Sequence, residues 1–98
     1  MTPYTVEEIR KKASPVAKSY GVKRMNLFGS YARGEATRES DIDLYIDKGR
    51  LDSLIQYFSF VLELEEIFGR HVDVVTTEIE DSKFLNSIRK EGVLLYEE

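Results

Sequence analysis

Residues 27–46 read LFGSYARGEATRESDIDLYI, and this stretch decides both the fold and the candidate site. It begins as the end of an apolar strand, breaks at Gly29–Ser30, and continues as a polar loop. After the loop, apolar residues alternate with Asp41 and Asp43, which is the pattern of a strand with one buried face. The stretch therefore predicts two strands, with Gly-Ser at one end of their connecting loop and two aspartates at the other.

The rest of the chain predicts further helices and strands around this pair. Thr5 and Glu8 form the pattern of a capping box, and Gly21 ends the helix that the box begins. The later elements are a helix over 52–68 capped by Asp52, a strand over 71–77, a helix from Asp81 to about Lys90, and a strand over 93–97. We expect one domain over residues 1–98 with an α/β (α+β) fold, in which helices flank one small sheet.

Composition limits the classes of function. The chain has 98 residues, a net charge of −4 and no cysteine, so a disulfide framework and a thiolate metal site are excluded. The acidic balance does not favour binding to long nucleic acid, which needs a basic face. No run approaches the roughly 20 apolar residues of a membrane span, and the first residues do not resemble a signal peptide. We expect no membrane partner and a cytoplasmic location.

Asp41 and Asp43 carry the first chemical signal. Side chains two residues apart on a strand lie on one face, roughly 7 Å apart along the chain. Two such carboxylates repel each other unless a cation lies between them, and Mg²⁺ in proteins takes one or two carboxylates together with substrate phosphates. A pair of such ions can stabilise the attacking and leaving oxygens of a phosphoryl displacement. The alternative is an exposed sheet face with two solvated aspartates.

Gly29–Ser30 and Asp73 complete the set. A glycine lets the backbone come close to a ligand, and N–H groups at the start of a helical turn can bind phosphate oxygens. Asp73 lies within the apolar stretch VDVV, where an unpaired charge is costly. It is either a third metal ligand, a base that takes a proton from a nucleophile, or an edge aspartate facing water. For Gly29–Ser30 the alternative is a simple turn.

Together, LFGSYARGEATRESDIDLYI and VDVV resemble the minimal nucleotidyltransferases (MNT) of the DNA polymerase β superfamily. More narrowly, they resemble the antitoxin half of the HEPN/MNT toxin–antitoxin pairs. The resemblance covers nearly the whole chain and implies the polymerase-β-like nucleotidyltransferase fold with a small mixed sheet. It also implies that Gly29 and Ser30 hold the phosphates of a nucleoside triphosphate. By the same resemblance Asp41, Asp43 and Asp73 are the catalytic, metal-binding acidic residues.

The resemblance further implies the reaction. A hydroxyl attacks the α-phosphate of ATP with two Mg²⁺ ions as cofactors, and AMP passes to a tyrosine of a HEPN-family toxin. Arg33 matches the family's arginine in the signature G-S-x-A-R-G, with a role in phosphate binding or in loop structure; a plain surface arginine is the alternative. A second hypothesis is an antitoxin without catalysis, which neutralises its partner by binding alone.

Two other features leave alternatives open. The helix over 52–68 is apolar around well over half of its circumference, so it is either buried or offers a face to a partner, which is the toxin or a second copy in a homo-oligomer. His71 is the only histidine, so it cannot form a typical zinc site, and we interpret it as a residue at the edge of a strand.

Overall fold

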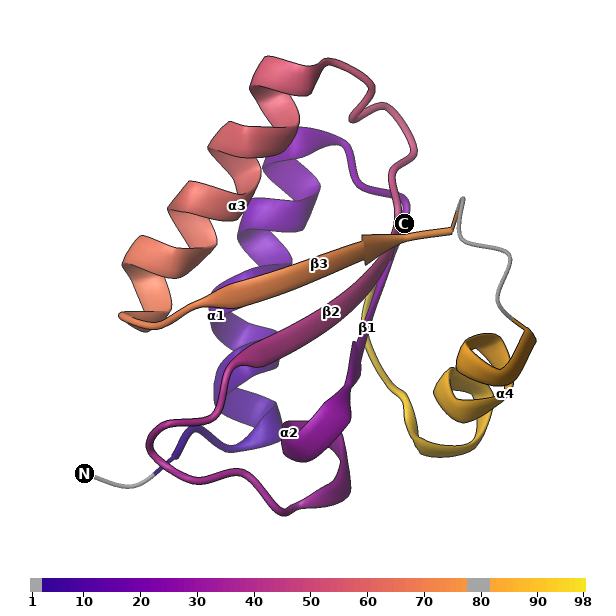
Figure 1. Ribbon diagram of the computed structural model, residues 1–98. Helices are drawn as coiled ribbons and strands as arrows, with labels where there is room; N and C mark the ends of the chain where they lie inside the picture. Colours follow the sequence, from indigo (N-terminus) through magenta and orange to yellow (C-terminus); the bar gives the residue numbers. More distant parts are fainter. Residues whose placement is uncertain (1–2, 78–81) are drawn as a thin grey trace.

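The computed structural model describes residues 3–77 and 82–98, in which four strands form one sheet with helices on both faces (Figure 1). The elements are α1 (Val6–Tyr20), β1 (Arg24–Phe28), α2 (Gly29–Arg33), β2 (Ile42–Asp47), α3 (Leu54–Phe68), β3 (Val72–Thr76), α4 (Ser82–Glu91) and β4 (Val93–Glu97). The predicted α/β fold with a small mixed sheet is confirmed.

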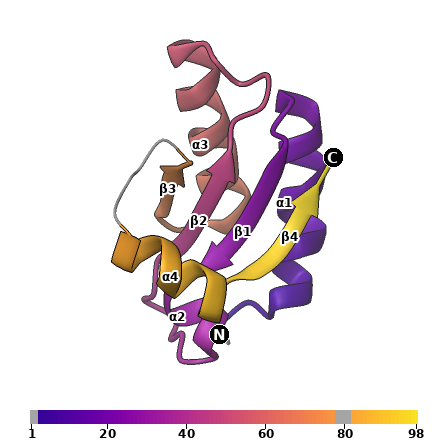
Figure 2. The same cartoon turned by 90° about the vertical axis from the view of Figure 1, so that its right-hand side faces the viewer.

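The sheet has the strand order β3-β2-β1-β4. Strand β1 is antiparallel to both β2 and β4, whereas β2 and β3 are parallel and are connected through α3. Figure 2 shows the four strands side by side, with α4 in front of them and α1 and α3 behind. Because of these directions, β2 and β3 begin at the same end of the sheet, and β1 ends there.

Local signals place most helix ends where the sequence predicts them. The Thr5 hydroxyl accepts a hydrogen bond from the Glu8 N–H at 3.1 Å, and the Glu8 carboxylate accepts one from the Thr5 N–H at 2.9 Å. This reciprocal pair begins α1 and satisfies two N–H groups that the helix itself cannot pair. Helix α3, however, is capped by Ser53 rather than Asp52, so the predicted cap is one residue early. The predicted cap at Asp81 lies outside the described residues.

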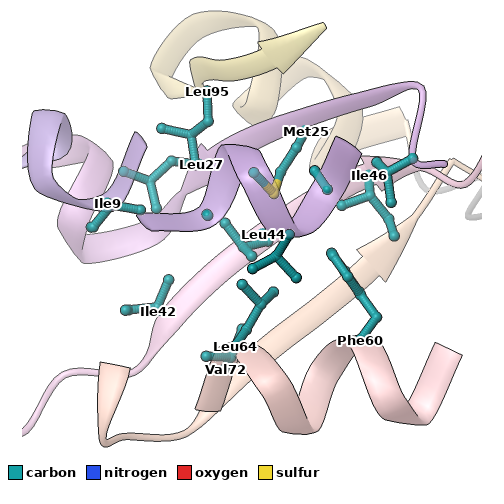
Figure 3. Packing of buried hydrophobic residues seen from close by; sticks show 14 of the residues in the cluster. Ile9, Met25, Leu27, Ile42, Leu44, Ile46, Phe60, Leu64, Val72 and Leu95 are labelled. Atoms are coloured by element: carbon teal, nitrogen blue, oxygen red, sulfur yellow. The ribbon is translucent and has the colours of Figure 1, made fainter. Parts of the chain in front are cut away.

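The hydrophobic core lies between the sheet and the pair α1 and α3. Figure 3 shows side chains from both helices and from all four strands meeting there. The labelled members are Ile9, Met25, Leu27, Ile42, Leu44, Ile46, Phe60, Leu64, Val72 and Leu95. Helix α4 lies over the opposite face of the sheet, which carries the polar residues of β1 and β2 (Figure 2). The core therefore fixes the sheet from one side and leaves part of the other side accessible.

Helix α3 has two different sides. Its inner side carries Phe60, Leu64 and Phe68, which are buried against the sheet. Its outer side is an exposed apolar face formed by Leu54, Ile55, Phe58 and Leu62, with exposed fractions of 55–79%. The helix is thus core on one side and accessible to a partner on the other. No helix in the described ranges is both long enough and apolar enough to cross a membrane.

Candidate functional site

The predicted site residues lie at the end of the sheet where β1 ends and β2 and β3 begin. Helix α2 follows β1 without a linking residue, and Figure 2 shows it below the end of that strand. Phe28, the last residue of β1, has an extended backbone and makes no side-chain cap for α2. The first N–H groups of α2 therefore have no partner from the helix or from that cap, as an anion-binding turn requires.

Gly29 and Asp43 are in close approach. The two strands pair antiparallel with Phe28 opposite Asp43, so the residue after Phe28 comes directly against the Asp43 side chain. Gly29 has a φ of +73°, and a Cβ atom placed on it would lie 2.2 Å from Oδ2 of Asp43. No residue with a side chain fits there unless Asp43 moves. Glycine thus brings the backbone of the α2 turn directly to a carboxylate.

The three predicted aspartates come together. Asp43 and Asp73 are neighbours across the parallel strands β2 and β3. Asp41 precedes β2, and its carboxylate lies with that of Asp73 in a group whose ligand atoms are all within 4.8 Å of one another. Partial burial, followed by the influence of Asp73 and then of Asp41, raises the pKa of Asp43 to about 6. Carboxylates crowded in this way need a positive charge among them.

His71 is the third member of the group with Asp41 and Asp73. Its Nε2 is 2.7 Å from Oδ1 of Asp73, and its Nδ1 is 3.0 Å from Oε2 of Glu65 on α3. The hydrogen bond to Asp73 and that residue's charge raise the pKa of His71. The interpretation of His71 as a residue at the edge of a strand did not foresee these contacts. The signal was the spacing, because His71 and Asp73 are two residues apart, as Asp41 and Asp43 are.

Arg33 lies at the end of α2, and its guanidinium pairs with acidic residues. It is 2.5 Å from Glu35 in the following loop and 3.6 Å from Glu91 at the end of α4. Its charge also opposes the rise in the pKa of Asp43. These contacts tie the loop to α4, and a role of Arg33 in loop structure stays a prediction. Contact with a phosphate would require the guanidinium to leave them.

Arg70 holds the loop that leads to Asp41, and sequence reasoning missed it. Its Nη1 donates to the Tyr31 hydroxyl and, at 3.4 Å, to the carbonyl of Ser40, the residue before Asp41. The guanidinium also lies 5.0 Å from the centre of the Tyr4 ring. The two hydrogen bonds of Arg70 reach residues 30 and 39 positions away in the chain, so no local sequence pattern predicts them.

The site offers oxygen ligands for a hard cation. The carboxylates of Asp43 on β2, Asp73 on β3 and Asp41 just before β2 meet next to the α2 turn, and burial together with the charges of Asp73 and Asp41 raises the pKa of Asp43. Mg²⁺ prefers oxygen ligands of this kind and usually retains positions for substrate phosphates. Asp41, Asp43 and Asp73 therefore fit a divalent cation, and the adjacent N–H groups of α2 fit a phosphate.

A cavity of about 530 Å³ lies on the same sheet face, farther along β1 and β2. Its walls include Asn26, Tyr45 and Asp47 from the sheet and Leu85 and Arg89 from α4. Phe84 of α4 packs against Phe28 and Tyr45 of the sheet, and none of the three aspartates lines this cavity. The carboxylates are thus at the edge of the cavity's face rather than inside it.

Comparison with known proteins agrees with this geometry. The family model described as "Polymerase beta, Nucleotidyltransferase" matches residues 11–98. A protein of Thermococcus cleftensis named "Protein adenylyltransferase MntA" is 32% identical, and the match covers 95% of this chain and 98% of the relative. A protein of Methanocaldococcus jannaschii, provisionally named a protein adenylyltransferase, is 44% identical over 72% of this chain and 76% of its own length.

The fold is also found among solved structures. A chain in a crystal structure described as "the toxin-antitoxin with AMP-PNP" aligns with a TM-score of 0.76. The alignment covers 91% of this chain and 73% of that chain, at 21% sequence identity. At this identity the likeness shows a shared fold.

Proposed function

The chain belongs to the polymerase beta nucleotidyltransferase family, and on this premise we propose that it is a protein adenylyltransferase that moves AMP from ATP to a partner protein. One observation carries the proposal. Asp41, Asp43 and Asp73 meet at the end of the sheet where Gly29–Ser30 begins α2, so carboxylates and phosphate-binding N–H groups face one place. A protein that only binds has no chemical need for this arrangement.

Gly29 and Ser30 supply the phosphate side of the proposed site. The N–H groups at the start of α2 and the Ser30 hydroxyl bind the β- and γ-phosphates of ATP. Gly29 is required because any side chain there would displace Asp43. Arg33 steadies the loop through Glu35 and Glu91, and its positive charge lowers the repulsion that the phosphates meet near Asp43.

Asp41, Asp43 and Asp73 supply the cation side. Their oxygens would hold two Mg²⁺ ions, which when bound neutralise charge on the phosphates and on the attacking oxygen. Burial first, and then the neighbouring charges of Asp73 and Asp41, raise the pKa of Asp43, and a bound cation would offset the part that comes from those charges.

In the proposed reaction a hydroxyl oxygen of the acceptor forms a bond to the α-phosphorus of ATP. The bond from that phosphorus to the bridging oxygen of the β-phosphate breaks, and pyrophosphate leaves. Asp73 accepts the proton of the hydroxyl, as its exposed position beside Asp43 allows. The products are the AMP ester of the acceptor and pyrophosphate.

A partner protein presents the acceptor, which we propose to be a tyrosine of a HEPN-family toxin, so that the transfer makes this chain an antitoxin. Two findings support this: a relative named as a protein adenylyltransferase and a chain of the same fold from a toxin–antitoxin structure. In this proposal residues 1–98 act as one nucleotidyltransferase domain in the cytoplasm. The outer face of α3 is then the candidate contact surface for the toxin or for a second copy of the chain.

The proposal is tested by label transfer. The protein is incubated with Mg²⁺, α-labelled ATP and a lysate of the source organism, beside the same reaction with Asp41→Ala and Asp43→Ala combined. We expect label on one protein band, and no label with the double variant. If none of the four nucleoside triphosphates labels a protein, although the chain is folded and its partner is bound, neutralisation by binding replaces catalysis.

A further inference from the structure

The imidazole of His71 lies between two carboxylates that come from different elements. Nε2 is 2.7 Å from Oδ1 of Asp73 on β3, and Nδ1 is 3.0 Å from Oε2 of Glu65 on α3. The same Glu65 oxygen accepts the backbone N–H of Val72 at 3.1 Å. A chain of contacts therefore runs from α3, through the imidazole, to the third aspartate of the site.

The two carboxylates that flank the His71 ring are not equally fixed. The Glu65 side chain is 28% exposed and is held by a backbone N–H as well as by the ring, whereas the Asp73 side chain is 51% exposed. Each ring nitrogen thus has a carboxylate oxygen beside it, one from each element. With both nitrogens engaged, the ring has one orientation, and it is set from the better-held Glu65.

We propose that His71 is a positioning residue for Asp73: oriented by Glu65, it binds Oδ1 and leaves the second oxygen of Asp73 for the reaction centre. This inference rests on the proposed function. The torsion that turns a carboxylate is broad, so an exposed aspartate alone would sample many orientations. Near Asp41 and Asp43 such an aspartate would also be pushed outward by repulsion. The 2.7 Å contact with Nε2 of His71 holds Oδ1 of Asp73 against both effects.

The size of the expected effect follows from geometry. A catalytic group displaced by about 1 Å can lower the rate by about a hundredfold. Loss of the His71 contact should act on kcat, because Asp73 takes part in the transfer step. It should leave KM for ATP nearly unchanged, because the phosphates are held at Gly29 and Ser30. A residue that only stabilised the fold would lower the amount of folded protein. Its loss would not lower the kcat of the folded protein while leaving KM for ATP unchanged.

Two substitutions separate the contact with Asp73 from the contact with Glu65. The amide nitrogen of glutamine reaches about as far as Nε2, and that of asparagine reaches about as far as Nδ1. His71→Gln can therefore still donate to Asp73, while His71→Asn can donate only to Glu65. We expect His71→Asn to lower kcat by about ten- to a hundredfold and His71→Gln to restore most of it, with equal unfolding temperatures. Equal kcat values for the two variants would overturn the proposal.

A second measurement does not need activity. His71 is the only histidine, so its two ring nitrogens can be assigned without ambiguity in nitrogen NMR spectra of the whole chain. We expect Asp73→Asn to shift the Nε2 resonance and Glu65→Gln to shift Nδ1. Glu66→Gln, which changes the next carboxylate on the same helix, is the matched control and should shift neither. An Nε2 resonance that does not respond to Asp73→Asn would overturn the proposal.

The two measurements also distinguish this inference from the proposed function. If the wild-type protein transfers no AMP to any partner, the proposed function fails, and the NMR spectra still decide whether His71 holds Asp73. If the wild-type protein is active but His71→Asn and His71→Gln behave alike, the proposed function stands and the positioning role is overturned.

Discussion

Along strand β2, Ile42, Leu44 and Ile46 point into the core (Figure 3). Asp43 alternates with them and is only partly buried, so it belongs to the other face of the strand. The inner three are fully buried in an apolar cluster, which is the arrangement that stabilises the fold. Asp43 is half-buried beside two other carboxylates and against a glycine with positive φ, and its pKa is raised to about 6. One face of this strand thus stabilises the protein, and the other face lowers its stability. A face that lowers stability in this way indicates a functional site.

The first prediction concerns the face of β2 that carries Asp43, and it adds one methyl group beside that residue. Gly29→Ala should lower AMP transfer by about a hundredfold or more, because the new Cβ must displace the Asp43 carboxylate. Gly34→Ala is a matched control, since Gly34 has nearly the same φ, +74°, but nothing lies within 4 Å of its Cβ position. Both variants should lose about 1–2 kcal/mol of stability through backbone strain. Steady-state transfer assays and thermal unfolding measure the two effects; equal activities would show that contact with Asp43 is unimportant.

The second prediction breaks the inner face. Leu44→Ala should lower the free energy of unfolding by about 2–5 kcal/mol, because Leu44 is fully buried and a cavity remains. In a chain of 98 residues this is a large share of the total stability. Denaturant titration followed by circular dichroism measures it. A loss below about 1 kcal/mol would mean that the core packs loosely at this strand.

The third prediction concerns the charge on the outer face. Folding raises the pKa of Asp43 to about 6 from its ordinary value of 3.8. At a pH between these two values, the folded protein therefore holds a proton that the unfolded chain has released. Without added cations, the contribution of Asp43 to stability should be lost as the pH rises from about 4 to about 6. Asp43→Asn should remove this part of the pH dependence. Unfolding temperatures measured across that range check it, and parallel curves for both proteins would contradict it.

The fourth prediction has the smallest effect. Phe58→Ser and Leu62→Ser change the outer face of α3 and should alter the stability of the isolated chain by less than about 0.5 kcal/mol. Phe60 lies on the inner side of the same helix. Phe60→Ser should destabilise the isolated chain strongly, because Phe60 is fully buried. Thermal unfolding compares the three. If the outer variants unfold as readily as Phe60→Ser, another part of the protein covers that face.

Sequence reasoning succeeded where signals are local. The capping box at Thr5, the strand alternation through β2 and the turn at Gly29 each lie within a few residues, and the structure reproduces them. It failed where contacts join distant segments: Arg70 reaches Tyr31 across 39 residues. For His71 the local spacing was present, but its partner Glu65 becomes visible only when α3 packs beside β3.

The most direct test of the proposed transfer compares α-labelled with γ-labelled ATP in the same reaction of the wild-type chain, Mg²⁺ and its partner. Attack on the α-phosphorus leaves the AMP label on the acceptor and releases the γ-label with pyrophosphate. We predict a labelled protein with α-labelled ATP and none with γ-labelled ATP. Label from γ-labelled ATP, or from neither nucleotide, would contradict adenylyl transfer by the carboxylates where β2 and β3 begin.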